Sequence, residues 1–303
     1  MELDPTLHTK SMDVQLRTLV IDAFRHLSPL PQRPYLVIID GLDECRDKGT
    51  QQFILRLLCE TITVHKLPLR FLIGSRPESH IRDSFDKESL YSVTRRVILD
   101  EKFNPGRDIE VFLRDGFAKI CAENSILSHV ERPWPKEGII DLLVQRSSGQ
   151  FIYAATVLKF VGADFCSPTK QLALVLKPDS TAFSDLDQLY TQILSVFPRA
   201  VNIVHVLGII SVSRGDFDGQ FAEVMEDIFG MEEGELKLVL RGLSSLMKDE
   251  DDNWAHYVPH FAHASFGDYL FDSSRSGPFH VNRQEYENQL TIRSFALIIL
   301  SIR

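Results

Sequence analysis

Three carboxylates directly follow an uninterrupted apolar run near the start of the chain. The run is Tyr35–Ile39, with the sequence YLVII, and the next six residues are DGLDEC, which place Asp40, Asp43 and Glu44 close together. A short, β-branched run without polar residues is typical of a strand buried on both faces of a parallel sheet. We therefore expect these carboxylates at the carboxyl edge of such a sheet, where α/β folds bind their ligands.

A hydrophobic strand that ends in aspartate is the Walker B arrangement, in which the carboxylate holds Mg²⁺ on a bound nucleotide. We interpret Asp40 as the metal residue and as a nucleotide contact. Asp43 and Glu44 are candidates for orienting an attacking water molecule. The competing interpretation is a strand that merely ends in an acidic turn, with Asp43 or Glu44 capping the following helix.

A cation follows the second apolar run of the chain. Residues 70–75 read RFLIGS and are followed by Arg76 and Pro77. If the two strands are parallel neighbours, Arg76 lies at the same sheet edge as Asp40, and its guanidinium group can reach the terminal phosphate of a nucleotide. Arg76 is therefore the predicted phosphate sensor and, with Asp43 and Glu44, a candidate catalytic residue.

The elements around these residues alternate between helix and strand. Helical spacing covers 12–26, 51–64 and 80–85, and a third strand is predicted over 93–99, so the first part should be a doubly wound α/β sheet. Beyond residue 106 the apolar periodicity predicts an all-α region, followed by a winged-helix-like unit with an extended segment at 255–262. The predicted helices there are 107–124, 135–147, 151–161, 186–197, 199–211, 217–229, 232–247, 265–271 and 284–300. We expect three domains: an α/β core over 1–105, a small helical domain over 106–180, and a winged-helix-like and helical region over 181–303.

Composition excludes some classes of function. Acidic residues outnumber basic ones by 42 to 33, and no long Lys/Arg cluster is present, which disfavours nucleic-acid binding. The four cysteines are widely spaced, as is typical of a reducing compartment, and the N-terminus shows no export signal, so we expect a cytoplasmic protein. The apolar stretch 295–300 is too short to span a bilayer, so no membrane association is expected.

The segments YLVIIDGLDEC at 35–45 and FLIGSRPE at 71–78 resemble the NACHT NTPases, especially their fungal branch. The resemblance extends along nearly the whole chain through SGQFIYAAT at 148–156, LDQLY at 186–190 and HASFGDYL at 263–270. It implies a partial P-loop NTPase of the STAND class.

In that family Mg²⁺ and ATP or GTP bind between the α/β core, a small helical domain and a winged helix, and the nucleotide switches the protein between closed and oligomeric forms. The resemblance implies that Gly149 begins the helical segment that faces the nucleotide and that His263 marks the winged-helix contact. It also implies protein partners or self-association in the full-length form.

The phosphate-binding loop of that family is missing from the sequence. The Walker A loop requires Gly-x-x-x-x-Gly-Lys-Ser/Thr, and none of the 16 glycines is followed by lysine. We therefore expect the family's first strand and its loop to lie upstream of Met1, and we expect the present chain to be inactive alone. Two alternatives stay open: an ATPase that receives its loop from another chain or an upstream exon, and a non-catalytic adaptor that uses the helical half for protein contacts.

Overall fold

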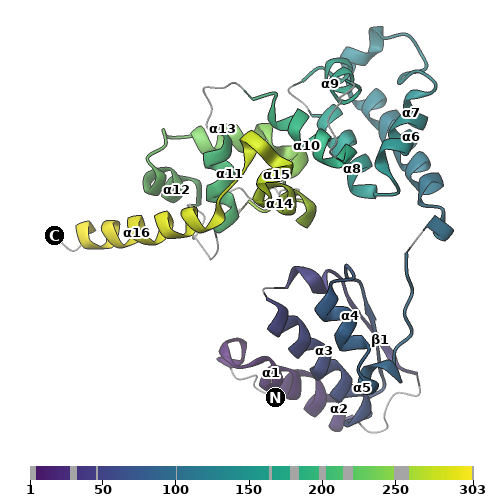
Figure 1. Cartoon of the computed structure of the whole chain (residues 1–303), viewed down its shortest axis with the longest axis vertical. Helices are drawn as coiled ribbons and strands as arrows, with labels where there is room; N and C mark the ends of the chain where they lie inside the picture. The colour runs from purple at the N-terminus through teal and green to yellow at the C-terminus, as the bar shows by residue number, and fades with distance from the viewer. Residues whose placement is uncertain are drawn as a thin grey trace. The chain divides into compact units, whose positions relative to one another are not determined.

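The computed structural model describes residues 5–27, 33–45, 47–99, 101–163, 166–177, 184–197, 203–213, 221–248 and 259–301; the side chains of Glu101 and of residues 293–301 lie outside the described part. The chain divides into two compact units, Met1–Ile98 and Leu99–Arg303 (Figure 1). The predicted first boundary, at residue 105, lies close to this division, while the boundary predicted at 180 stays a prediction.

Helices and two strands alternate in the first unit, in the predicted order. A short 3-10 turn η1 (Leu7–Thr9) precedes a continuous helical stretch made of α1 (Met12–Leu16), the π-helical η2 (Arg17–Ile21) and α2 (Asp22–Arg25). Then follow β1 (Tyr35–Ile39), the 3-10 turn η3 (Leu42–Glu44), α3 (Lys48–Thr63), β2 (Leu69–Ile73), α4 (Ser79–Phe85) and α5 (Glu88–Tyr91). Asp47 caps α3, since its carboxylate accepts a hydrogen bond from the backbone N–H of Thr50 at 2.9 Å.

The two strands are parallel neighbours, as predicted, and their register runs from Tyr35 opposite Leu69 to Ile39 opposite Ile73. Side chains alternate between the faces of a strand, so the two faces of this sheet differ in composition and burial. On one face Ile73 packs against a small core of Leu42, Leu55, Cys59, Ile81 and Leu90. The other face carries Leu36, Ile38 and Leu72, which are 60%, 66% and 57% exposed.

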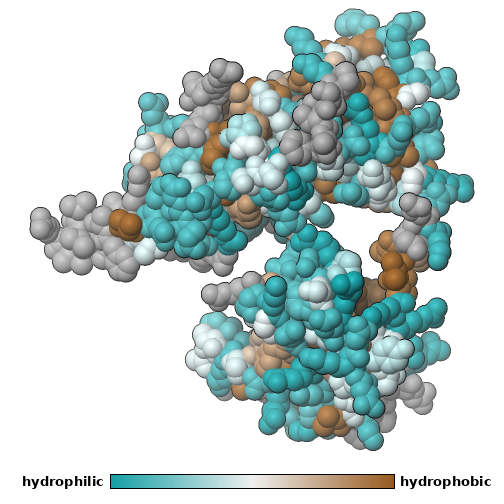
Figure 2. All heavy atoms as spheres, in the orientation of Figure 1, coloured by the Kyte–Doolittle hydropathy of each residue, from teal (hydrophilic) through white to brown (hydrophobic). Residues whose placement is uncertain are grey.

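The third strand predicted over 93–99 is wrong. Residues 94–99 form neither strand nor helix, and the described sheet contains β1 and β2 alone. Val97, Ile98 and Leu99 are largely exposed, and apolar atoms appear along the segment that follows α5 (Figure 2). An apolar run becomes a strand only where a neighbouring strand supplies hydrogen-bond partners, and neither β1 nor β2 pairs with this segment.

The regular elements of the second unit are helical, as predicted, over the residues that the structure describes (Figure 1). Its helices are α6 (Pro105–Glu123), α7 (Ile139–Ser147), α8 (Phe151–Val161), α9 (Pro168–Val175), α10 (Asp185–Leu194), α11 (Ile203–Val212), α12 (Phe221–Phe229), α13 (Glu235–Gly242), α14 (Ala264–Phe271), α15 (Ser273–Ser276) and α16 (Arg283–Ser301). Short 3-10 turns lie at η4 (Glu101–Phe103), η5 (Ser125–His129), η6 (Ser244–Leu246) and η8 (Gly277–Phe279). The sequence did not predict α9 as a separate helix.

The extended segment predicted over 255–262 is described only from residue 259 onward, because residues 249–258 lie outside the described part of the chain. On either side of them, Met247 and Phe261 form an isolated antiparallel bridge. The winged-helix assignment therefore stays a prediction.

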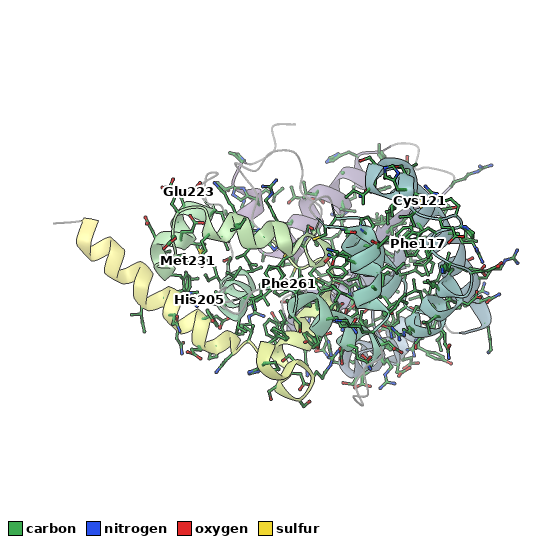
Figure 3. All side chains as sticks on the ribbon, turned by 90° about the horizontal axis from the view of Figure 1, so that it is seen from above. Phe117, Cys121, His205, Glu223, Met231 and Phe261 are labelled. Atoms are coloured by element: carbon green, nitrogen blue, oxygen red, sulfur yellow. The ribbon has the colours of Figure 1, made fainter. Side chains whose placement is uncertain are left out.

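Aromatic and apolar contacts join the helices of the second unit (Figure 3). On α6, the ring of Phe117 meets the ring of Trp134 edge-on, with centroids 5.6 Å apart, and the thiol of Cys121 donates to the carbonyl of Trp134. On α11, the ring of His205 contacts the rings of Phe229 and Tyr286, which also contact each other. Among the described residues, the helices are all too short or too polar to cross a bilayer.

Candidate functional site

The carboxyl ends of β1 and β2 bring the first group of predicted site residues together. Gly74, which follows β2, donates its N–H to the carbonyl of Ile39 at 2.8 Å, and its own carbonyl accepts from the N–H of Leu42 at 3.1 Å. Asp40 therefore lies beside Gly74 at one sheet edge. A Cβ atom on Gly74 would lie 2.6 Å from Asp40 Oδ1, so the carboxylate of Asp40 occupies the space that the missing side chain leaves.

A tight turn carries the chain from Asp40 to the other two carboxylates. Gly41 has a φ of +70°, which favours glycine because other residues are strained there. The buried side chain of Leu42 anchors the turn, and the side chain of Glu44 folds back toward Gly41. Asp40 and Glu44 are both exposed, so their carboxylates are accessible from solvent.

Asp43 is held by the segment that follows β2. Its Oδ1 accepts from the backbone N–H of Arg76 at 2.9 Å and from the hydroxyl of Ser75 at 3.2 Å, and its Oδ2 accepts from Nε of Arg76 at 2.6 Å. The side chain of Asp43 is 5% exposed, whereas that of Arg76 is 44% exposed. Burial raises the pKa of Asp43, but the hydrogen bonds from the side chain and backbone of Arg76 outweigh it and hold the pKa below its ordinary value.

This contact distinguishes Asp43 from Glu44, which were both predicted to orient an attacking water molecule. Asp43 joins the turn after β1 to the turn after β2, and its acceptors are engaged within the protein. Neither Asp43 nor Glu44 supplies the cap of α3, because Asp47 does. Of the two water-orienting candidates, Glu44 is the accessible one.

A magnesium ion fits this site only together with a nucleotide. The described residues contain no group of three or more His, Cys, Asp or Glu side chains that could hold a metal ion by themselves. Mg²⁺, however, is commonly held by one or two carboxylates, with phosphate oxygens and water completing its octahedron. The exposed carboxylate of Asp40 suits that mode of binding.

Gly149 and His263, the two other predicted contacts, belong to the second unit. Gly149 has a φ of +78° in the turn between α7 and α8, and a Cβ atom there would lie 3.2 Å from the ring of Pro105. His263 caps α14, because its Nδ1 accepts from the backbone N–H of Ser265 at 3.1 Å. The hydroxyl of Ser265 also lies 2.7 Å from this Nδ1 and 2.9 Å from the hydroxyl of Tyr190, on α10. The structure thus groups Asp40, Asp43, Glu44 and Arg76 in one unit and these two residues in the other.

Two polar residues next to the acidic turn, the buried Gln51 and the half-buried His80, were not predicted from the sequence. Gln51, on α3, is 5% exposed and donates its amide N–H groups to the carbonyls of Asp43 and Cys45, at 3.0 and 2.9 Å. Its amide oxygen bonds to Nε2 of His80, on α4. Gln51 shares a helix face with Leu55 and Cys59, and a polar residue in that apolar stripe is the signal that could have identified it.

The family model described as "Nephrocystin 3, N-terminal" matches residues 2–76 of the chain. The matched region takes in β1, the acidic turn, α3 and β2, and it reaches Arg76. No curated protein and no solved structure matches the chain significantly. Over these residues the chain is therefore similar to the N-terminal region of nephrocystin 3, a NACHT-associated region.

Proposed function

We propose that the chain is part of a NACHT-type signalling NTPase and that its first unit supplies the metal-binding and phosphate-sensing half of a nucleotide site. The observation that carries this proposal is the placement of Asp40 and Arg76 at the carboxyl ends of two adjacent parallel strands. That edge is where α/β folds bind nucleotides. The match of residues 2–76 to a NACHT-associated region supports the same conclusion.

The residues of this edge have distinct proposed roles. Asp40 would hold the Mg²⁺ of bound ATP or GTP, and this ion would neutralise phosphate charge. Arg76 would contact the terminal phosphate, with Asp43 fixing its position through two hydrogen bonds. Glu44, which is exposed, would orient the attacking water.

The phosphate cradle must come from a segment with a glycine-rich loop and lysine, which the sequence does not contain. Parallel sheets are normally covered on both faces, yet Leu36, Ile38 and Leu72 form a bare apolar face here. The exposed run Val97–Leu99 likewise has the composition of a strand without a partner. Both features support the proposal that a strand and loop from upstream of residue 1 complete this sheet.

In this proposal the complete protein is a nucleotide-dependent oligomerisation switch of the cytoplasm, of the kind that serves innate-immunity or incompatibility signalling in fungi. Gly149 and His263, both of the second unit, would be nucleotide contacts, as the resemblance to the NACHT NTPases implies. The exposed turn at Gly149 supports its role. For His263, Nδ1 accepts a hydrogen bond from the N–H of Ser265, so a neutral ring carries its proton on Nε2 and can donate it to a phosphate oxygen.

Calorimetry with Mg·ATP and Mg·GTP tests the proposal on two proteins: the present chain, and the chain extended upstream by a strand with a Gly-x-x-x-x-Gly-Lys-Ser/Thr loop read from the genomic sequence. We expect negligible binding by the present chain and restored binding by the extended one. Tight Mg²⁺-dependent binding by the present chain would contradict the role given to the missing loop.

A protein-interaction adaptor is the second candidate. The observation that favours it is an exposed aromatic pair on the second unit, Phe112 and Phe151, whose ring centroids lie 5.8 Å apart. Exposed aromatic side chains are enriched in protein interfaces. An extended chain that carries the loop and still binds no nucleotide would favour this adaptor role.

A further inference from the structure

A hydrogen-bonded pair of polar side chains, the buried Gln51 and the half-buried His80, connects the two halves of the candidate site. Gln51 comes from the first turn of α3 and His80 from the first turn of α4. The site itself is built from the turn after β1, which carries Asp43, and the turn after β2, which carries Arg76. Gln51 contacts the first turn, and His80 belongs to the segment that continues from the second.

The hydrogen bonds of Gln51 determine how the pair is arranged. Its Nε2 donates to two carbonyls, those of Asp43 and Cys45, so its Oε1 is the atom that faces His80. An amide oxygen only accepts hydrogen bonds, and therefore Nε2 of His80 must carry the proton. Nδ1 of His80 is buried and has no hydrogen-bond partner among the described residues.

His80 is linked to Arg76 through a short, hydrogen-bonded segment. The N–H of Glu78 donates to the carbonyl of Arg76 at 2.9 Å, and the N–H of Arg82 donates to the carbonyl of Glu78 at 2.9 Å. The hydroxyl of Ser84 donates to the carbonyl of His80 at 2.8 Å. These bonds fix the backbone around His80 within α4. The ring of His80 then holds the side chain of Gln51 in place through their hydrogen bond.

We propose that Gln51 and His80 are positioning residues of the nucleotide site, which hold the acidic turn in register with the Arg76 segment so that Asp43 can orient Arg76. The inference rests on the proposed function for the nucleotide, but the geometry it invokes exists without one. Two contacts connect the segment after β1 with the segment after β2. Asp43 pairs with Arg76 between the two turns, and Gln51 bonds to His80 between the helices that follow them. Without the Gln51–His80 pair, the carbonyls of Asp43 and Cys45 lose the side-chain donor that fixes them.

Amide hydrogen exchange of the full chain, measured by NMR without nucleotide, tests this inference. The probe is the backbone N–H of Arg76, which donates to Asp43 Oδ1 and therefore reports whether Asp43 is in place. The reference is the N–H of Leu58 within α3, which reports opening of the whole unit. The variants are Gln51→Ala, His80→Gln and His80→Asn, because glutamine can place a donor near the position of Nε2 and asparagine places one near Nδ1. Thr61→Ala is the matched control: Thr61 is fully buried on α3 and its hydroxyl donates to the carbonyl of Leu57, so the change leaves the Gln51–His80 contact untouched.

We expect the Arg76 amide to exchange at least about tenfold faster in Gln51→Ala and His80→Asn, with Leu58 exchange unchanged, and we expect His80→Gln to stay near wild type. Thr61→Ala should leave the ratio of the two exchange rates unaltered. Equal acceleration at Arg76 and Leu58 in all variants would show that the pair only stabilises the core and would overturn the inference, as would an unchanged Arg76 rate. If Gln51→Ala does not fold, the two His80 variants decide. Since no nucleotide is present, failure of nucleotide binding in the calorimetry would not affect this result.

Discussion

Replacing Asp43 with alanine removes the acceptor that joins the two turns of the site. Asp43 accepts from the backbone N–H of Arg76, from Nε of Arg76 and from the hydroxyl of Ser75. Its side chain is nearly buried, whereas Arg76 is almost half exposed. Loss of the carboxylate therefore leaves the guanidinium group able to bind water, and it leaves the backbone N–H of Arg76 without its partner.

The magnitude follows from these exposures. A hydrogen bond to a charged group contributes about 1.5–3 kcal/mol, and an exposed partner recovers part of this from solvent. Counting the backbone contact fully and the two exposed contacts in part, we expect Asp43→Ala to lower the free energy of unfolding of the first unit by about 2–3 kcal/mol. Asp43→Asn keeps one acceptor but turns an N–H group toward Arg76 or Ser75, so we expect a smaller loss, of about 1–1.5 kcal/mol.

Hydrogen exchange measured by mass spectrometry supplies the assay. Peptides from α3 report opening of the first unit, and peptides from α6 serve as the control within the same molecule. Asp43→Ala should reduce protection in α3 and leave α6 unchanged. A change in α3 of less than about 0.5 kcal/mol would refute the view that Asp43 joins the two turns.

The carboxylate of Asp43 also makes the free energy of unfolding of the first unit depend on pH. The pKa of Asp43 is lowered in the folded protein, so its contribution is fully present above the unfolded value of about 3.9 and is lost as the pH falls through the folded pKa. The wild-type first unit should therefore lose stability below about pH 4, and Asp43→Asn should remove part of that loss. Identical acid profiles for the two proteins would contradict the assignment.

Two further variants test other contacts. Gly74→Ala would place a Cβ atom 2.6 Å from Asp40 Oδ1 and force that carboxylate aside. We therefore expect weaker Mg·ATP binding by the extended chain in calorimetry, with little change in its melting temperature. Unchanged binding would argue against Asp40 as the metal residue. Asp187→Ala removes the ion pair with Arg275, in which Asp187 is buried and the two contacts are 2.7 and 3.0 Å long. We expect this change to lower the free energy of unfolding of the second unit by about 3 kcal/mol, measured by urea denaturation with tryptophan fluorescence. Glu110→Ala, in an exposed pair, is the control and should cost less than about 0.5 kcal/mol.

The sequence predicted the two strands and most helices because their apolar patterns are long and regular. The apolar run YLVII was predicted to be a strand buried on both faces. The strand forms, but its first four residues are exposed, so the predicted burial is wrong for the described chain. The run at 93–99, VTRRVIL, is rich in β-branched residues and ends in three apolar ones, yet it forms no strand, because strand formation depends on a neighbour that composition does not reveal. The separate helix α9 was missed although Pro168 stands at its first position, a common helix-start signal.

The sequence predicted which residues lie at the sheet edge, but it did not predict which of them contact one another. Strand ends brought Asp40 and Arg76 to one edge, as the parallel pairing required. The sequence could not show that Asp43, rather than Glu44, turns toward Arg76, since those residues lie 33 positions apart and the choice depends on the turn at Gly41. Gln51 and His80 were missed for the same reason, because their contact joins two helices.

The role of Asp40 is the centre of this account, and Asp40→Asn tests it most directly. The change keeps the size of the side chain and removes its charge, so thermal melts of the present and extended chains, each with and without Mg·ATP, give a four-way comparison. We predict that Mg·ATP stabilises the extended wild-type chain, that Asp40→Asn removes most of this stabilisation, and that the present chain melts at nearly the same temperature with or without the substitution. Equal destabilisation by Asp40→Asn in all four conditions would show that Asp40 is structural and would contradict the proposed metal site.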